Sequence, residues 1–263
     1  MRVTISLAQM QVVLGDPATN LKKTEEWLAE ASRRGSDLFV LPELWTTGAD
    51  WQNVKVLLTG QSVNLQAIGN LAKKYNLWLT GSLLALDEQG CPTNTSVLFN
   101  PQGWRVGIYR KIHLFGLREE DQYLAPGHQL PTFETPWGKA GLAIGYDLRF
   151  PEMFRTYALA DVNLVCIAGA WPRPRLNHWR ALLRARAIEN QMYVVAVNQV
   201  GNDDQEDLCG HSLIIDPWGE TIVEAGDTEL LLTAAIDIQR VTEVRQRMSV
   251  LKDRRPDVYR LDK

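Results

Sequence analysis

A carboxylate directly follows an apolar run near the start of the chain. Glu43 lies in segment 39–45 (FVLPELW). Active sites of open α/β sheets lie beyond the carboxyl ends of strands, so this position suits a catalytic acid or base. The flanking Leu44 and Trp45 would desolvate the carboxylate and raise its pKa, as general base catalysis near neutral pH requires. A surface glutamate paired with a cation is the alternative, and position alone favours that alternative.

A second segment, 107–115 (GIYRKIHLF), places basic side chains at the end of a strand-like run. If Lys111 is buried near a carboxylate, its fixed positive charge could stabilise an oxyanion that develops during a reaction. Taken alone, the segment is more typical of a solvated surface lysine.

A third segment, 141–152 (GLAIGYDLRFPE), has the layout of a nucleophile elbow. It combines an apolar strand, a tight turn and a helix that Pro151 opens. The central position of the turn is Gly145. Glycine suits strained backbone geometry but offers no nucleophile. Without other motifs, a simple strand-to-helix turn would be the favoured interpretation.

A fourth segment, 170–175 (AWPRPR), closes another apolar run and leads into a helical segment. Trp171, Arg173 and Arg175 suit recognition of a small carboxylate-bearing ligand, because arginine can bind a carboxylate with two parallel hydrogen bonds. A purely structural role for this loop remains equally open. In the helix that follows, Trp179 and its apolar neighbours are expected to form the core face.

The histidines and cysteines predict no metal centre. The four histidines show no metal-ligand spacing, and segment 209–211 (CGH) is too short and isolated for a zinc site. The chain also lacks a glycine-rich phosphate loop and a dinucleotide fingerprint. We therefore expect neither a metal nor a cofactor.

The elements that must position these residues alternate along the chain. β-branched and apolar runs predict strands at 3–12, 37–41, 77–86, 96–99, 104–109, 140–144, 162–168, 192–197, 212–216, 221–224 and 230–238. Amphipathic periodicity predicts helices at 20–34, 65–75, 151–160, 178–191 and 241–248. Segments 100–103 (NPQG) and 216–219 (DPWG) are expected hairpin loops. This order predicts an α/β protein with a mixed sheet and external helices, organised as one domain over 1–263.

Composition excludes several classes of protein. The 263 residues carry 28 Lys+Arg against 31 Asp+Glu, a net charge of −3, and 45% of them are hydrophobic, which excludes a disordered tail and a basic nucleic-acid arm. We expect no nucleic-acid or membrane partner. No apolar run reaches the roughly 18–20 residues of a membrane span, and no signal peptide is recognisable. Three widely spaced cysteines fit free thiols in a reducing cytosol, so a cytoplasmic location is expected.

Three of these segments, in this order, resemble the signature segments of the nitrilase superfamily of carbon–nitrogen hydrolases. They are 41–43 (LPE), 109–115 (YRKIHLF) and 146–152 (YDLRFPE), and the resemblance extends from Val3 to about Tyr259. It implies a four-layer α-β-β-α sandwich that pairs into homodimers or larger assemblies, with the tail from about residue 249 in dimer contacts. It also implies hydrolysis of non-peptide C–N bonds by a Glu-Lys-Cys triad through a thioester.

The resemblance assigns roles residue by residue. Glu43 matches the general base and Lys111 the lysine that stabilises the oxyanion. Glu120 matches a second glutamate that positions substrate and lysine, and the backbone N–H of Tyr146 would complete the oxyanion hole. Gly145 is the departure, because it stands where the family has its catalytic cysteine. 

No other cysteine of the chain matches that position. Cys166 lies inside an apolar strand-like run, whereas Cys91 and Cys209 lie in unrelated loops. Two explanations of Gly145 stay open. The chain is either one enzyme with an inactivating change or a natural non-catalytic homologue that binds a small amide or a partner. The intact glutamates and lysine favour the first.

Within the family, segments 171–175, 185–191 and 216–219 look most like those of ω-amidases, which act on 2-oxo dicarboxylic acid monoamides such as 2-oxoglutaramate. Amidases of deaminated glutathione or of N-carbamoyl compounds, and nitrilases, are the alternatives. By charge, Arg173 or Arg175 is expected to bind the distal carboxylate of such a substrate.

Overall fold

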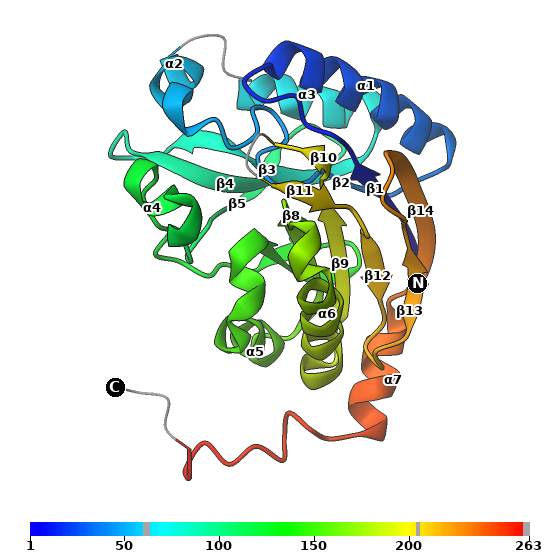
Figure 1. Ribbon diagram of the computed structural model, residues 1–263. Coiled ribbons are helices and arrows are strands. Elements are labelled where there is room, and N and C mark those ends of the chain that lie inside the picture. Colours follow the sequence, from blue (N-terminus) through cyan, green and yellow to red (C-terminus); the bar gives the residue numbers. More distant parts are fainter. Residues whose placement is uncertain (60–63, 204–205, 260–263) are drawn as a thin grey trace.

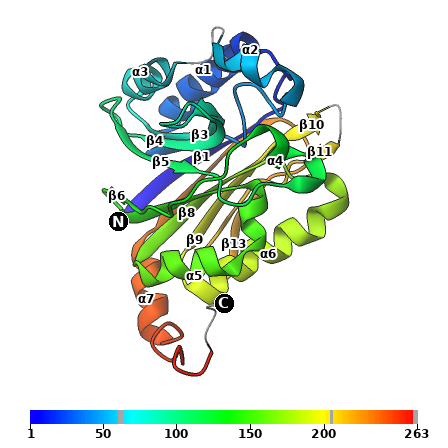
Figure 2. The same cartoon turned by 90° about the vertical axis from the view of Figure 1, so that its left-hand side faces the viewer.

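Figure 1 shows the computed structural model of the chain, which describes residues 1–59, 64–203 and 206–259. Two six-stranded sheets lie face to face, and helices cover the outer face of each (Figures 1 and 2). Helices α1 (Pro17–Arg33) and α3 (Leu65–Tyr75) cover the first sheet, whereas α5 (Pro151–Leu159) and α6 (Leu176–Asn190) cover the second. This arrangement is the four-layer α-β-β-α sandwich that the sequence resemblance implied.

The first sheet has the strand order β14-β1-β2-β3-β4-β5. In chain order its strands are β1 (Arg2–Gln9), β2 (Leu38–Val40), β3 (Trp78–Leu86), β4 (Pro92–Phe99), β5 (Arg105–Arg110) and β14 (Leu230–Asp237). β1, β2 and β3 are parallel neighbours, and β4 and β5 continue as antiparallel hairpins. β5 therefore runs in the same direction as β2, so the carboxyl ends of both strands lie on the same side of the sheet.

The second sheet has the strand order β13-β12-β9-β8-β7-β6. In chain order its strands are β6 (Phe133–Thr135), β7 (Gly138–Ile144), β8 (Val162–Gly169), β9 (Tyr193–Asn198), β12 (Leu213–Ile215) and β13 (Thr221–Glu224). β7, β8 and β9 are parallel, so their carboxyl ends share one edge as well. Each is buried along almost its whole length, as expected for strands covered on both faces.

Apolar side chains of the two inner faces form the largest core of the molecule. Ile5 and Leu7 of β1 are fully buried in the same cluster as Leu142 of β7 and Val195 of β9. Burial of each such side chain contributes about 1.5–3 kcal/mol to folding. The sheets are thereby held at a fixed separation, and the side chains that follow their strands are brought toward one another.

Local capping explains where the outer helices begin. The Asp16 side chain accepts a hydrogen bond from Thr19 N (3.0 Å), and Pro17 occupies the first turn, so α1 starts three residues before the predicted boundary. Asn64 caps α3 in the same way through Gln66 N (2.9 Å). 

All predicted strands and helices have counterparts, with shifted ends. β4 begins four residues before the predicted residue 96, and both predicted hairpin loops join antiparallel strands. The short elements that were not predicted include α2 (Val54–Thr59), α4 (Glu120–Tyr123), β6, β10 (Val200–Asn202) and β11 (Asp207–Cys209). Elements of three to six residues are too short to show a clear periodicity.

The last helix, α7 (Gln239–Arg247), leads into residues 249–259, which pass below α6 and α5 in the view of Figure 1. Val258 and Tyr259 of this segment are exposed. Its part in dimer contacts stays a prediction. Among the described residues, no helix combines the length and the apolar character that crossing a membrane would require.

Candidate active site

Side chains that follow five strands meet between the two sheets. Glu43 lies beyond β2 and Lys111 directly after β5, at one edge of the first sheet. Gly145 directly follows β7, Ala170 follows β8 and Gln199 follows β9, at the facing edge of the second sheet. The site is therefore at the carboxyl ends of parallel strands, where ligands bind in open α/β sheets.

Lys111 forms a buried ion cluster with two glutamates. Its Nζ lies 2.7 Å from Glu43 Oε1 and 2.9 and 2.7 Å from the two carboxylate oxygens of Glu120. All three side chains are less than 10% exposed. The structure thus brings together the base, the lysine and the second glutamate that the sequence singled out.

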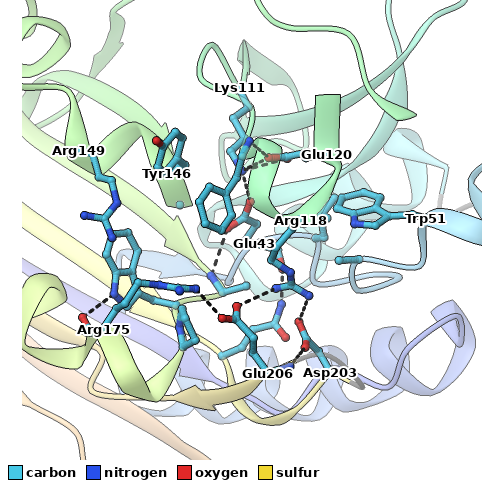
Figure 3. A pocket seen from close by; sticks show the side chains of 18 residues that line it. Glu43, Trp51, Lys111, Arg118, Glu120, Tyr146, Arg149, Arg175, Asp203 and Glu206 are labelled. Carbon is cyan, nitrogen blue, oxygen red and sulfur yellow. Dashed lines mark hydrogen bonds and ion pairs between the residues drawn. The ribbon is translucent and has the colours of Figure 1, made fainter. Parts of the chain in front are cut away.

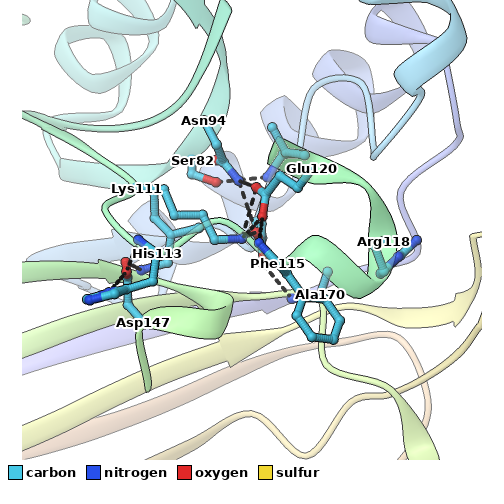
Figure 4. Close-up of polar contacts among 12 residues, drawn as sticks. Ser82, Asn94, Lys111, His113, Phe115, Arg118, Glu120, Asp147 and Ala170 are labelled. Carbon is cyan, nitrogen blue, oxygen red and sulfur yellow. Dashed lines mark hydrogen bonds and ion pairs between the residues drawn. The ribbon is translucent and has the colours of Figure 1, made fainter. Parts of the chain in front are cut away.

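Neutral donors fix the orientation of both carboxylates (Figure 4). Asn94 Nδ2 donates to Glu43 Oε1 (2.9 Å) and to Glu120 Oε1 (3.2 Å). The backbone N–H of Ala170 donates to Glu43 Oε2 (3.2 Å), and that of Phe115 donates to Glu120 Oε2 (2.8 Å). Asn94 was not predicted, because an amide inside a strand pattern carries no distinguishing sequence signal.

The environment shifts two pKa values within the cluster. Burial raises the pKa of Glu43, Lys111 opposes that shift, and the charge of Glu120 adds to it. Burial alone would lower the pKa of Lys111, but the charges of Glu120 and Glu43 outweigh burial and hold it above its ordinary value. The cluster therefore favours the protonated, cationic form of Lys111 and gives Glu43 a higher proton affinity than an ordinary carboxylate has.

Gly145 occupies the strained position of the elbow. Its φ is +43°, in the left-handed region that favours glycine. A β-carbon built on residue 145 would overlap Glu43 Oε2 and lie 3.0 Å from Glu43 Cδ. In this chain the Glu43 carboxylate therefore fills the space where a side chain of residue 145 would start.

A pocket adjoins this cluster, and Glu43, Lys111 and Glu120 form part of its lining (Figure 3). Tyr146 and Arg149 lie at one side of it in the view, and Trp51 lies at the other. Tyr146, Trp171 and Arg175, the candidates for substrate binding, line it together with Glu43, Lys111, Glu120 and Gly145. 

Arg173, in contrast, lies outside the pocket. Its guanidinium is 43% exposed and is paired with Asp207 (2.5 Å). Arg175 lines the pocket but already pairs with Glu206 (2.6 Å). Arg173 therefore lies away from the pocket and Arg175 has an acidic partner, so binding of a substrate carboxylate by either arginine stays a prediction.

Four charged lining residues were not singled out from the sequence: Arg118, Arg149, Asp203 and Glu206, the partner of Arg175. Arg118 pairs with Asp203 (2.6 Å), so these two charges neutralise each other. Arg149 lies over the rings of Trp171 (4.8 Å to the centroid) and Tyr146 (5.9 Å). Within the described part of the chain, Arg149 has no hydrogen bond and no acidic partner. Its position four residues after Gly145, inside the third signature segment, was the signal that could have identified it.

The cysteines lie away from this pocket. Cys166 is buried in β8, and burial raises the pKa of its thiol to about 12. Burial raises the pKa of Cys209 to about 11, and Cys91 is exposed in a turn. None of them lines the pocket, so none takes the place of a nucleophile at residue 145. In residues 1–59, 64–203 and 206–259, no three His, Cys, Asp or Glu side chains form a potential metal site.

A four-layer sandwich with a lysine between two buried glutamates at the strand ends defines the nitrilase type of fold and site. The sequence model of the carbon-nitrogen hydrolase family matches residues 4–246, and the chain belongs to this family.

Relatives of the chain carry amidase names. It is 39% identical over 260 residues to the 2-oxoglutaramate amidase of Bacillus subtilis (98% of this chain, 100% of the relative). It is 32% identical over 270 residues to the mouse omega-amidase NIT2 (98% and 97%). Among solved structures, a CN-hydrolase superfamily protein of Xanthomonas campestris, which has an arsenic adduct in the active site, superposes with a TM-score of 0.90 at 30% identity (97% and 98%).

Proposed function

We propose that this chain has the substrate site of an amidase for small carboxylate-bearing amides, such as 2-oxo dicarboxylic acid monoamides, and binds such an amide without hydrolysing it. The observation that carries the proposal is the intact Glu43–Lys111–Glu120 cluster beside a glycine at the elbow. The 2-oxoglutaramate amidase and omega-amidase names of the relatives support the substrate class.

With a cysteine at position 145, the site would perform covalent catalysis. Glu43 would take the thiol proton, and the thiolate would attack the amide carbon. Lys111 and the backbone N–H of Tyr146 would stabilise the resulting oxyanion. The C–N bond would then break, with Glu43 returning the proton to the departing ammonia. Glu43 would next activate the water that hydrolyses the thioester.

Glycine removes the first covalent step. No C–S bond can form at residue 145, and the members of such a triad depend on one another, so loss of the nucleophile removes most of the rate. The binding groups remain, because Lys111, Glu120 and the lining residues keep their contacts. 

Arg149 is the residue that we assign to the distal carboxylate of the substrate. Among the pocket arginines, Arg118 and Arg175 already have acidic partners. Arg149 presents a guanidinium without one, held between two aromatic rings. An anionic group entering the pocket would therefore gain most from Arg149.

The test compares Gly145→Cys with Gly145→Ala, which has the same β-carbon but no thiol. We expect ammonia release from 2-oxo monoamides by Gly145→Cys alone, measured by an ammonia-coupled assay. If Gly145→Cys releases no ammonia from monoamides, N-carbamoyl compounds or nitriles, the hydrolase assignment is wrong. 

A non-catalytic binding protein is the second candidate, and the placement of Glu43 favours it, because that carboxylate already fills the space beside residue 145. This candidate predicts equal affinity for the amide, measured by calorimetry, in the parent and in Gly145→Cys, with no turnover in either. Turnover by Gly145→Cys would exclude it.

A further inference from the structure

A buried carboxylate outside the ion cluster connects the elbow to the lysine strand. Asp147 is fully buried in the turn that follows Gly145 and does not line the pocket. Its Oδ2 accepts hydrogen bonds from Tyr109 OH (2.6 Å) and from the backbone N–H of Ile144 (2.9 Å). Its Oδ1 accepts from the backbone N–H of His113 (3.1 Å) and contacts His113 Nδ1 (2.8 Å).

These partners flank the two reacting positions on both sides. Tyr109 lies two residues before Lys111 in the chain, and His113 lies two residues after it. Figure 4 shows His113 and Asp147 in contact beside Lys111. Ile144 directly precedes Gly145. The Asp147 carboxylate thus joins the segment that carries Lys111, which follows the first sheet, to the strand end that carries Gly145 in the second sheet.

Two further contacts make this connection rigid. The Tyr109 hydroxyl also accepts a hydrogen bond from Ile112 N (3.2 Å), and burial together with the charge of Asp147 raises the pKa of Tyr109, so that the hydroxyl keeps its proton. The His113 ring stacks on Phe150 (3.6 Å between centroids, 8° between planes). 

The far end of the turn is held separately. Buried Arg186 of α6 donates to the backbone oxygen of Leu148 from Nε (3.1 Å) and Nη2 (2.9 Å). Loss of an Asp147 contact would therefore leave the Leu148 end in place and release the end that carries residue 145.

We propose that Asp147 is a positioning residue, which sets the distance between Lys111 and the backbone of residue 145 through its hydrogen bonds with Tyr109, His113 and Ile144. The inference rests on the proposed roles of Lys111 and position 145. A displacement of about 1 Å between reacting groups can reduce a rate by roughly 100-fold, so a buried contact far from the substrate can control the reaction.

The chain offers a matched pair of variants for the test. Tyr109→Phe removes the hydroxyl that binds Asp147. Tyr157→Phe removes an equally buried hydroxyl of α5, which donates to the backbone oxygen of Leu142 in β7 (2.7 Å) and does not bind Asp147. Both are made in a Gly145→Cys background that also carries Cys91→Ser, because Cys91 is the exposed native thiol in the described part of the chain.

The readout is the rate at which iodoacetamide alkylates the thiol introduced at position 145, followed against pH by mass spectrometry. A nearby ammonium favours the thiolate. Tyr109→Phe is therefore expected to move the midpoint of the alkylation profile to higher pH and to lower kcat roughly tenfold or more with little change in KM. Tyr157→Phe should leave the profile and kcat unchanged, although both variants lower Tm.

Identical profiles for the background and Tyr109→Phe would overturn the proposal, and so would equal shifts in both tyrosine variants. If Tyr109→Phe does not fold, Asp147→Asn, which keeps the side-chain shape, must give the same upward shift. The alkylation profile needs no substrate. Absent amide hydrolysis with an intact shift would therefore contradict the proposed function and support the positioning role.

Discussion

The carboxylate of Glu43 occupies the space in which a side chain on Gly145 would begin. A β-carbon at residue 145 would overlap Glu43 Oε2, and that same oxygen accepts a hydrogen bond from the backbone N–H of Ala170. The base and the nucleophile position are therefore in direct contact, and any substitution at 145 must move a carboxylate that three neighbours hold in place.

This contact predicts a stability cost for Gly145→Ala. A left-handed non-glycine residue costs about 1–2 kcal/mol, and displacement of Glu43 adds to that loss. Gly35→Ala is the matched control, because Gly35 also has a positive φ (+69°) but nothing lies within 4 Å of its added β-carbon. In urea unfolding, Gly145→Ala should lose more stability than Gly35→Ala. Equal losses would show that Glu43 does not resist a side chain at 145.

The raised pKa of Glu43 predicts a pH-dependent stability. A carboxyl whose folded pKa is above its unfolded value stabilises the fold below the unfolded pKa, and this contribution is lost as pH rises through the folded pKa. The unfolding free energy of Glu43→Gln minus that of the parent should therefore increase as pH rises above about 4.5. Only the slope is diagnostic, since the amide also changes local hydrogen bonds.

Glu25→Gln provides the control of opposite sign. The hydrogen bond from Lys74 lowers the pKa of Glu25, so its contribution is present above its unfolded pKa and lost as pH falls. The unfolding free energy of Glu25→Gln minus that of the parent should therefore decrease as pH rises, opposite to Glu43→Gln. The change should be small, because this surface pair is exposed to solvent. If the free-energy difference for Glu43→Gln stays constant or decreases as pH rises, the pKa of Glu43 is not raised by folding.

Removal of the lysine should be strongly destabilising. Lys111→Met leaves Glu43 and Glu120 buried without a cation, and breaking a buried pair in this way typically costs about 3–5 kcal/mol. Because protonation can relieve the unpaired charges, the loss should be larger at pH 8 than at pH 5. Urea unfolding at both pH values measures it, and a loss independent of pH would argue against two carboxylates that depend on Lys111.

Arg149 should determine recognition of the carboxylate end of a ligand. Calorimetry on the chain with Gly145 should show that Arg149→Leu weakens binding of a 2-oxo monoamide by roughly 10- to 100-fold, since a charged hydrogen bond contributes about 1.5–3 kcal/mol. Arg173→Leu is the control, because Arg173 lies outside the pocket on Asp207. If Arg149→Leu leaves the affinity unchanged, or if both variants lose affinity equally, the ligand's carboxylate is bound by a residue other than Arg149.

The order of the longer strands and helices, and the family resemblance, could both be inferred from the amino-acid sequence. Periodicity and capping act over a few residues, so the strand before Gly145 and the helix that Pro151 opens could be predicted from neighbouring residues alone. The absence of a thiol at position 145 is likewise visible in the sequence, because it is a matter of residue identity within a motif.

The pairing of the charged side chains, in contrast, became visible in the folded chain alone. Glu43 and Lys111 are 68 residues apart, and their contact depends on the packing of the strands of the first sheet. Arg173 and Arg149 look alike in sequence, but folding brings Asp207 to the first and no acidic side chain of the described residues to the second. Ion pairs depend on three-dimensional proximity, which local patterns do not encode, and so the arginine that we propose for the substrate carboxylate could be chosen only from the fold.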